Sequence, residues 1–148
     1  MTKKIILISC SSQKGNKPAQ AKDLYQSRLF KSALSYAYKL KPDKIYILSA
    51  LYCLLELDKI ISPYNVTLSY VPQDKRGADL KILTQSEKEL WGKKVIKQLS
   101  ALCNLSDDTF IVMAGQAYIS PIKESLKNLV EPLKGKRQGE RIKFLNKN

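Results

Sequence analysis

The sequence predicts an α/β protein with a three-layer, Rossmann-like fold and a mostly parallel central sheet of at least three strands. Short apolar runs at residues 4–9, 44–49 and 109–114 have the length and composition of strands that are buried on both faces. The segments between them carry apolar side chains at helical spacing, and strands that alternate with helices form parallel sheets through right-handed crossovers. The chain of 148 residues shows no long linker, so a single domain, residues 1–148, is expected.

The first third of the chain is expected to form a β-α-β unit. Residues 3–9 read KKIILIS, an apolar run between polar residues that suits the first strand. Residues 10–26 are a polar connection, and Ser27 is a suitable N-cap for a helix that Pro42 ends. The apolar positions of this helix are Leu29, Phe30, Ala33, Leu34, Ala37 and Leu40. The second strand follows at residues 44–49.

The middle of the chain gives weaker patterns. Residues 50–61 form a short apolar segment, and the polar stretch after them reaches Gly77. Residues 66–70 alternate and favour a short edge strand, whereas Pro63 and Pro72 favour a long loop. Loops of this length in compact domains usually carry function, and we expect the same here.

The last third predicts a long amphipathic helix, a strand and two further helices. Two capping boxes are available for the long helix, Thr84 with Glu87 or Ser86 with Glu89. Its apolar side chains are Leu90, Trp91, Val95, Leu99 and Leu102. The third strand, residues 109–114, ends at Gly115, and Ser120 and Pro121 are typical of the start of another helix. That helix would face inward with Ile122, Leu126 and Leu129, and a last short helix would dock through Ile142, Phe144 and Leu145.

The composition is that of an ordinary globular protein. The chain is 44% hydrophobic and 26% charged, which argues against disorder, collagen-like repeats and a disulfide scaffold. No apolar run approaches the roughly 18 residues of a membrane helix, and the run after Lys4 is too short for a signal peptide. We therefore expect a cytoplasmic protein without membrane contacts.

The sequence contains no histidine, which excludes several enzyme classes. Zinc hydrolases, Ser-His-Asp and Cys-His nucleophile pairs and facial-triad iron sites all use imidazole. The three cysteines, Cys10, Cys53 and Cys103, lack CxxC spacing and are expected to be reduced thiols. Neither a metal site nor a cofactor is therefore expected.

The net charge of +13 indicates a polyanionic partner. The charge is uneven along the chain, because residues 1–50 hold ten Lys or Arg against two Asp. A positive field attracts polyanions, and contacts between Lys and phosphate release counterions, so nucleic acid is the expected partner. The alternative is a Lys-rich solvated surface without a specific partner.

Three strand ends supply the candidate ligand-binding residues. Ligands of parallel sheets bind outside the carboxyl ends of the strands, where the strand order reverses. The ends here are residues 9–11, 49–52 and 114–118, which carry small, hydroxyl-bearing and aromatic side chains. The candidates are Ser9, Cys10, Ser11, Lys14, Ser49, Tyr52, Tyr64, Gly115 and Tyr118.

The segment SCSSQKG, residues 9–15, is the nearest match to a phosphate-binding loop. Its small residues let backbone N–H groups approach an anion, and Lys14 adds positive charge. It lacks the GxxxxGK[ST] and GxGxxG patterns, so an ordinary turn after a strand is an equal alternative. Cys10 is either a small buried residue or a thiol whose pKa Lys14 lowers.

Three motifs resemble those of known families. The stretch ILSALYCLLELDKIISPYNVTL, residues 47–68, closely resembles the signature ILSGLYGLL…D-x-I-x-PY of the peroxide-stress protein family YaaA. Residues 8–14 carry C-S-x-x-K just after the isoleucine of a strand end, and residues 21–30 carry A-x-x-LY-x-S-x-x-F; both resemble motifs of a shorter group of uncharacterised bacterial and archaeal domains. Further matches are Leu90-Trp91-Gly92, Ala114-Gly115 with Tyr118, and Pro132-Leu133 with Gly135. The resemblance covers nearly the whole chain.

The resemblance implies DNA binding, protection from oxidative damage and a fold distantly similar to uracil-DNA glycosylases. Two positions depart from the family pattern. Cys53 stands where the signature has glycine, and it would be strained there if the position requires a positive φ. Residues 11–13 are less basic than the run that usually follows the first cysteine.

The leading hypothesis is a nucleic-acid-binding α/β domain that acts on a base or nucleotide by cleaving its N-glycosidic bond. Tyr52 and Tyr64 would stack on the base, and the carboxylate of Asp58, with Glu56 as the fallback, would stabilise positive charge on the sugar. The alternatives are that the tyrosines only pack, and that Asp58 caps a helical turn at Lys59.

Basic side chains near the strand ends and in the tail are the expected phosphate contacts, with DNA favoured as the polymer. They are Lys14, Lys17, Lys22, Lys134, Lys136, Arg137 and Arg141. For the tail cluster, a solvated patch is the alternative. Two rival functions remain open: an enzyme or sensor for a free nucleoside or nucleotide, and a non-catalytic interaction module in stress or phage defence.

Overall fold

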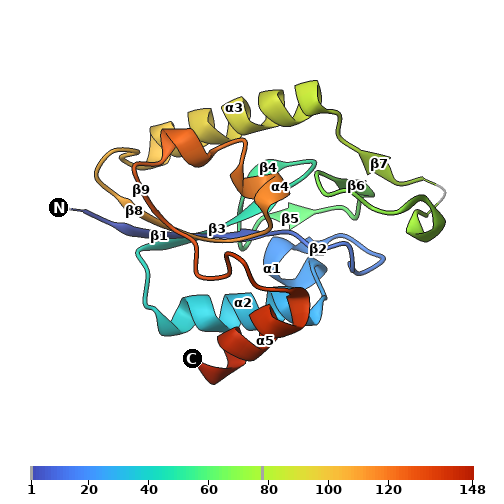
Figure 1. Ribbon diagram of the computed structural model, residues 1–148, viewed down its shortest axis with the longest axis horizontal. Coiled ribbons are helices and arrows are strands. Elements are labelled where there is room, and N and C mark those ends of the chain that lie inside the picture. The colour runs from blue at the N-terminus through green and yellow to red at the C-terminus, as the bar shows by residue number, and fades with distance from the viewer. Residues whose placement is uncertain (1, 78) are drawn as a thin grey trace.

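A five-stranded, mostly parallel sheet forms the centre of the protein, with helices on both of its faces (Figure 1). The structure, a computed structural model, describes residues 2–77 and 79–148. The strand order is β4-β3-β1-β8-β9. The strands are β1 (Lys4–Ser9), β3 (Lys44–Ser49), β4 (Cys53–Glu56), β8 (Thr109–Met113) and β9 (Asn128–Val130). Only the β3–β4 pair in this sheet is antiparallel, so the predicted α/β class with a mostly parallel sheet is confirmed.

Strand β1 lies at the centre of the sheet, between β3 and β8. Ile6 pairs with Ile45 on one side and with Ile111 on the other. The side chains of β1 alternate between two cores, because successive residues of a strand point to opposite faces. Ile5 and Leu7 belong to one core, and residues 6 and 8 belong to the other. All four are at most 1% exposed, which explains why the sequence shows a continuous apolar run.

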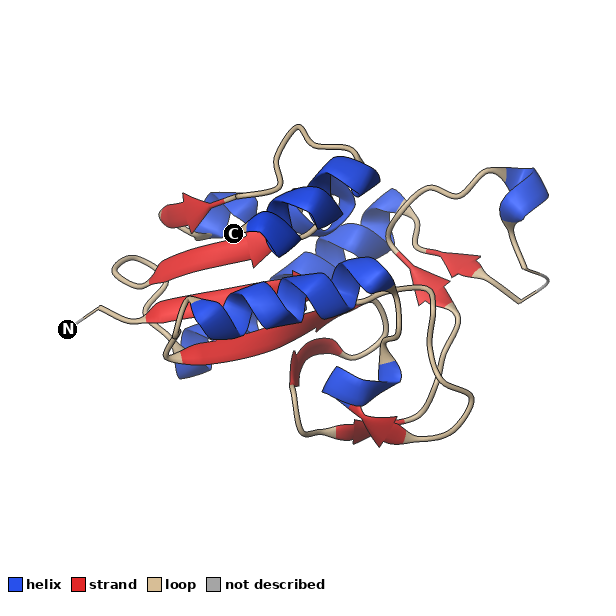
Figure 2. Ribbon diagram, turned by 90° about the horizontal axis from the view of Figure 1, so that it is seen from below, coloured by secondary structure: helices blue, strands red, loops and turns tan. Residues whose placement is uncertain are grey.

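Helices α2 (Arg28–Lys39) and α5 (Gln138–Lys147) run along the same face of the sheet, opposite α3 (Figures 1 and 2). Ser27 caps α2 as predicted: its hydroxyl accepts a hydrogen bond of 3.1 Å from the backbone N–H of Phe30. The rings of Tyr36 and Phe144, with centroids 5.8 Å apart, join the two helices.

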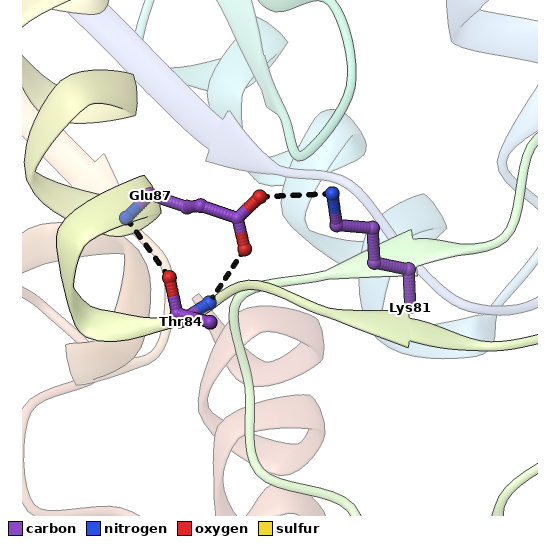
Figure 3. Close-up of polar contacts among 3 residues, drawn as sticks. All are labelled: Lys81, Thr84 and Glu87. Atoms are coloured by element: carbon purple, nitrogen blue, oxygen red, sulfur yellow. Dashed lines mark hydrogen bonds and ion pairs between the residues drawn. The ribbon is translucent and has the colours of Figure 1, made fainter.

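Helix α3 (Gln85–Leu102) covers the other face and begins with the first of the two predicted capping boxes (Figure 3). The Thr84 hydroxyl accepts from the backbone N–H of Glu87, whose carboxylate accepts from the backbone N–H of Thr84. The same carboxylate pairs with Lys81 Nζ at 2.8 Å. Lys81 lies in β7 (Lys81–Ile82), which pairs with β6 (Val66–Thr67), so this contact ties the start of α3 to the predicted loop region.

The segments predicted as connections contain short elements. Helix α1 (Ala21–Leu24) follows β2 (Ala19–Gln20), and β2 pairs with β5 (Ile60–Ile61). A 3₁₀ turn, η1 (Gln73–Lys75), interrupts the loop between β6 and β7.

The predicted helix that starts at Pro121 is wrong. A single helical turn, α4 (Gln116–Ile119), precedes this position, and a 3₁₀ turn, η2 (Lys123–Ser125), follows it. The chain then enters β9, because Phe110 and Ile111 of β8 offer a free edge that pairs with Leu129 and Val130. No helix among residues 2–77 and 79–148 is long and apolar enough to cross a membrane.

Candidate binding site at the strand ends

The strand order places a topological switch point between β1 and β8. From β1 the chain adds β3 on one side of the sheet and then crosses to add β8 on the other side. The crevice beyond the carboxyl ends of two such strands is where open α/β sheets bind their ligands. The candidate site should therefore lie just beyond Ser9 and Met113.

A cavity of about 180 Å³ lies at this position. The cavity is lined by the ends of β1 and β8, the first two turns of α2, the turn that contains Leu133 and the first turn of α5. The residues that line it are Ile8, Ser9, Cys10, Ser11, Ser12, Ser27, Leu29, Phe30, Ala33, Met113, Ala114, Leu133, Gln138 and Arg141. Unpaired backbone N–H groups and the positive end of the helix dipole make such a junction favourable for an anion.

The polar lining of the cavity is cationic or neutral. Arg141 is its one charged side chain, and four serine hydroxyls and the amide of Gln138 supply hydrogen bonds. Arg141 is positioned by its own Nε, which donates a 2.9 Å hydrogen bond to the carbonyl oxygen of Lys136. Gly115 lies beside the guanidinium, since a Cβ at this position would be in ordinary van der Waals contact, 3.9 Å from Arg141 Nη1.

A cluster of hydroxyl groups lies next to the cavity, around Ser49 at the end of β3. The Tyr64 hydroxyl is 2.6 Å from the Tyr25 hydroxyl and 2.7 Å from Ser49 Oγ. Ser49 Oγ also accepts a 3.0 Å hydrogen bond from the backbone N–H of Tyr52. Burial raises the pKa of Tyr25 and Tyr64 well above the ordinary phenol value, so both hydroxyls keep their protons at neutral pH.

The Lys14 ammonium covers the ring of Tyr64. Its Nζ is 4.3 Å from the Tyr64 ring centroid and 5.8 Å from that of Tyr25, a cation–π arrangement. Partial burial lowers the pKa of Lys14 below its ordinary value. Within the described residues Lys14 makes no ion pair, so its charge is available to a ligand.

Cys10 lies between the cavity and Tyr118, the tyrosine that follows the end of β8. It lines the cavity, and its Sγ lies 3.5 Å from the hydroxyl of buried Tyr118. The Tyr118 hydroxyl in turn lies 3.4 Å from Thr67 Oγ1, in β6. The structure therefore brings together the predicted residues of all three strand ends, and the long loop reaches the same place through Tyr64 and Thr67.

The environment of the two tyrosines favours packing over base stacking. The rings of Tyr25 and Tyr52 pack against the Tyr64 ring in T-shaped arrangements, with centroids 6.3 Å and 5.5 Å away, and the Lys14 ammonium lies over the Tyr64 ring. Tyr52 is half-buried, and its hydroxyl is 3.5 Å from the carbonyl oxygen of Ser62. Tyr64 in particular has little ring surface left for a base.

Asp58 does not lie at the strand ends, contrary to expectation. The motif after β3 turns back as the antiparallel strand β4, so that Glu56 pairs with Tyr46, near the start of β3. Three residues of strand span about 10 Å, and Asp58 lies still further along, in the turn after β4. Its side chain is 77% exposed and pairs with Lys22 at 3.3 Å. Neither Asp58 nor the fallback Glu56 is part of the site, and no helix begins at Lys59.

The predicted nucleic-acid contacts divide into two groups. Lys14 and Arg141 belong to the site. Lys22 lies in α1, paired with Asp58, and Lys17 is exposed in the loop before β2. The tail residues Lys134, Lys136 and Arg137 precede α5, and only Lys136 is partly covered, with its Nζ 5.0 Å from the Phe144 ring.

Sequence reasoning did not assign several residues to the site: Tyr25, Ser27, Thr67 and Gln138. Tyr25 had a signal, because it is the tyrosine of the A-x-x-LY motif. Ser27 had one as well, since an N-cap serine next to a strand end is a common anion ligand. Gln138 had none.

Cys53 has a positive φ of 64°. Left-handed backbone costs a non-glycine residue roughly 1–2 kcal/mol, so the strain expected for this position is present. Cys53 is buried, and its backbone begins β4 where the chain reverses after Ser49.

The model of a protein family, described as a family of unknown function (DUF6884), matches residues 5–147. No curated protein matches the chain.

Proposed function

The chain belongs to the DUF6884 family, whose function is unknown, and we propose that it is a nucleic-acid-binding domain that seats a phosphate group of its ligand in the cavity between β1 and β8. We also assign the fold to the three-layer, Rossmann-like type, on the basis of the switch point and the helices on both faces of the sheet.

The observation that carries the proposal is the composition of the cavity. One guanidinium, four serine hydroxyls and the first turns of two helices converge on it, and none of its lining residues carries a carboxylate. Arginine, hydroxyls and helix N-termini are the groups that proteins use to hold phosphate. A cationic ligand would find no carboxylate to pair with there.

The volume of the cavity favours part of a larger ligand over a whole free nucleotide. Pockets that bury small-molecule ligands usually measure about 300–1,000 Å³, whereas this cavity measures about 180 Å³. A phosphate with part of its sugar fits such a space, and the rest of the ligand must lie on the surface. The net charge of +13 adds a long-range attraction for a polyanion.

Cleavage of a glycosidic bond is not part of this proposal. The transition state of that reaction needs a carboxylate close to the sugar. Asp58, which the sequence offered for this role, lies in the turn after β4 and is mostly exposed.

The test is the binding of a short phosphate-bearing probe to Arg141 variants. We expect the 5′-phosphorylated dinucleotide pdTpdT to bind the wild-type protein, measured by isothermal titration calorimetry, and thymidine without phosphate not to bind. Loss of a hydrogen bond to a charged group costs about 1.5–3 kcal/mol, so Arg141→Gln should weaken pdTpdT about 10- to 100-fold. Arg141→Lys should be intermediate, because lysine keeps the charge but loses the paired donors.

Arg76→Gln is the matched control, because it removes the same charge on the loop between β6 and β7 and should leave the affinity unchanged. Equal binding by Arg141→Gln and wild type, with an unchanged melting temperature, would show that the cavity is not the phosphate site.

A further inference from the structure

We propose that the surface between α2 and α5 is the track along which the sugar–phosphate backbone of a single-stranded nucleic acid runs as it leaves the cavity. The inference rests on the proposed function for its starting point, and it adds the path of the polymer. None of its basic side chains was singled out from the sequence.

Two shallow hollows form this surface, which we call the α2–α5 groove. One hollow is lined by Arg28, Gly139, Ile142, Lys143, Asn146 and Lys147. The other is lined by Gln13, Gln26, Arg28, Lys31, Ser32, Ser35 and Asn146. Arg28 and Asn146 line both hollows, so the two are adjacent parts of one surface. Figure 2 shows the two helices that frame it.

The groove begins at the rim of the cavity. Ser12 lines the cavity and Gln13 lines the groove. At the start of α2, Ser27 lines the cavity and Arg28 lines the groove. At the start of α5, residue 138 lines the cavity and residue 139 lines the groove. Three separate segments of chain thus have consecutive residues on the two surfaces, so the groove starts next to the cavity.

The charge of the groove is of one sign. Its four charged residues, Arg28, Lys31, Lys143 and Lys147, are all basic and exposed. None of the four forms an ion pair within the described residues. Other hollows of the protein mix the two signs: the one that contains Asp58 is lined by two lysines and three carboxylates.

The spacing of these cations suits a chain of phosphates. Arg28 and Lys31 are three residues apart on α2, and Lys143 and Lys147 are four apart on α5, so each pair lies on one side of its helix. The side-chain amides of Gln13, Gln26 and Asn146 line the same two hollows and provide neutral hydrogen-bond donors and acceptors. Several cations with polar neutral neighbours and no carboxylate favour a repeating anionic backbone.

The experiment measures the salt dependence of binding to a 20-nucleotide oligo-dT that carries a 5′-phosphate and a 3′-fluorescein, by fluorescence anisotropy. The groove variant combines Arg28→Gln, Lys31→Gln, Lys143→Gln and Lys147→Gln. The control variant removes the same charge on the opposite face of the sheet, with Lys88→Gln, Lys93→Gln, Lys94→Gln and Lys97→Gln in α3.

Each phosphate contact on a single strand contributes about 0.7 to the slope of log K against log salt. The groove variant should therefore flatten the slope by about 3 and weaken binding on the order of 100-fold at 0.1 M salt. The control should change the slope by less than about 1. The double variant Lys143→Gln/Lys147→Gln should show about half of the full effect, which guards against a folding defect in the quadruple variant.

Two results would overturn the inference. One is an equal change of slope in the groove and α3 variants. The other is a groove-dependent affinity for poly-glutamate that matches the affinity for oligo-dT, which would indicate an acidic protein as the partner. The affinity for pdTpdT distinguishes this proposal from the proposed phosphate site in the cavity. If the groove variant binds pdTpdT normally and keeps the wild-type salt dependence for oligo-dT, only the path along the groove is refuted. If the wild-type protein does not bind pdTpdT, the phosphate site in the cavity is refuted.

Discussion

Removal of one hydroxyl, by Tyr64→Phe, tests whether the tyrosine cluster is a structural support of the site. The hydroxyl of Tyr64 lies between two partners, the Tyr25 hydroxyl at 2.6 Å and Ser49 Oγ at 2.7 Å. Phenylalanine keeps the ring that packs against Tyr25, Tyr52 and Lys14. The substitution therefore changes the hydrogen bonds and leaves the packing intact.

The expected loss is about 2 kcal/mol of unfolding free energy. A typical buried hydrogen bond contributes about 1 kcal/mol, and a buried polar group left without a partner costs about 1–3 kcal/mol. Tyr25 is 0% exposed, so its hydroxyl cannot turn to water. Ser49 Oγ keeps one partner, the backbone N–H of Tyr52, which limits the loss on that side.

Urea unfolding followed by circular dichroism measures the effect, and Tyr52→Phe is the matched control. The Tyr52 hydroxyl has one partner at 3.5 Å in an exposed setting, so its loss should cost less than about 0.5 kcal/mol. At this chain length 2 kcal/mol corresponds to a fall in Tm of about 4–8 °C. Affinity for pdTpdT should stay unchanged in both variants. A Tyr64→Phe protein as stable as Tyr52→Phe, or one that binds the probe more weakly at full stability, would refute a supporting role for the hydroxyl.

Two glycine substitutions should have opposite effects on stability, measured by urea unfolding. A Cβ at Gly92 would lie 2.6 Å from the carbonyl oxygen of Pro121, so Gly92→Ala should lower the free energy of unfolding by about 1–3 kcal/mol despite the better helix propensity of alanine. A Cβ at Gly139 would meet nothing within 4 Å, so Gly139→Ala should raise the free energy of unfolding by up to about 1 kcal/mol. The hydrogen bond from Lys81 and the capping contacts with Thr84 lower the pKa of Glu87 from 4.5 to about 2. The stability that the Glu87 carboxylate adds is therefore fully present above pH 4.5 and is lost as the pH falls toward 2. Glu87→Gln should therefore be less stable than wild type at pH 7 and equal to it near pH 2, and a gap that persists at pH 2 would contradict this assignment.

The elements with strong local signals were predictable. Strands β1, β3 and β8 are buried on both faces, and a continuous apolar run is the direct result of that environment. The starts of α2 and α3 were predictable because Ser27 and Thr84 cap them through their own side chains, a local contact that leaves a local pattern.

The misplaced elements depend on contacts that no local pattern records. Strand β9 has three residues and exists because the edge of β8 is free to pair with it. Asp58 lies away from the strand ends because β4 runs back antiparallel to β3. The sequence of this short apolar segment is equally compatible with a turn that would keep Asp58 at the strand ends, so the sequence alone did not reveal its position.

The sequence predicted only part of the candidate site. Ser9 and Ser49 are the last residues of β1 and β3, and Cys10 follows Ser9, so the general rule for parallel sheets predicted that they lie together. The charge inside the cavity was not predictable as such, because Arg141 comes from α5, more than 130 residues from Ser9, and reaches the cavity only through the packing of α5 on α2.

The central claim is that phosphate is held between β1 and β8, and amide chemical shifts of the wild-type protein during a titration with pdTpdT test it most directly. The claim predicts that shifts appear first in residues 9–12, 114–115 and 138–141, that thymidine causes none of them, and that α3 stays unaffected. Shifts confined to α3 or to the loop between β6 and β7, or identical shifts with thymidine, would contradict it.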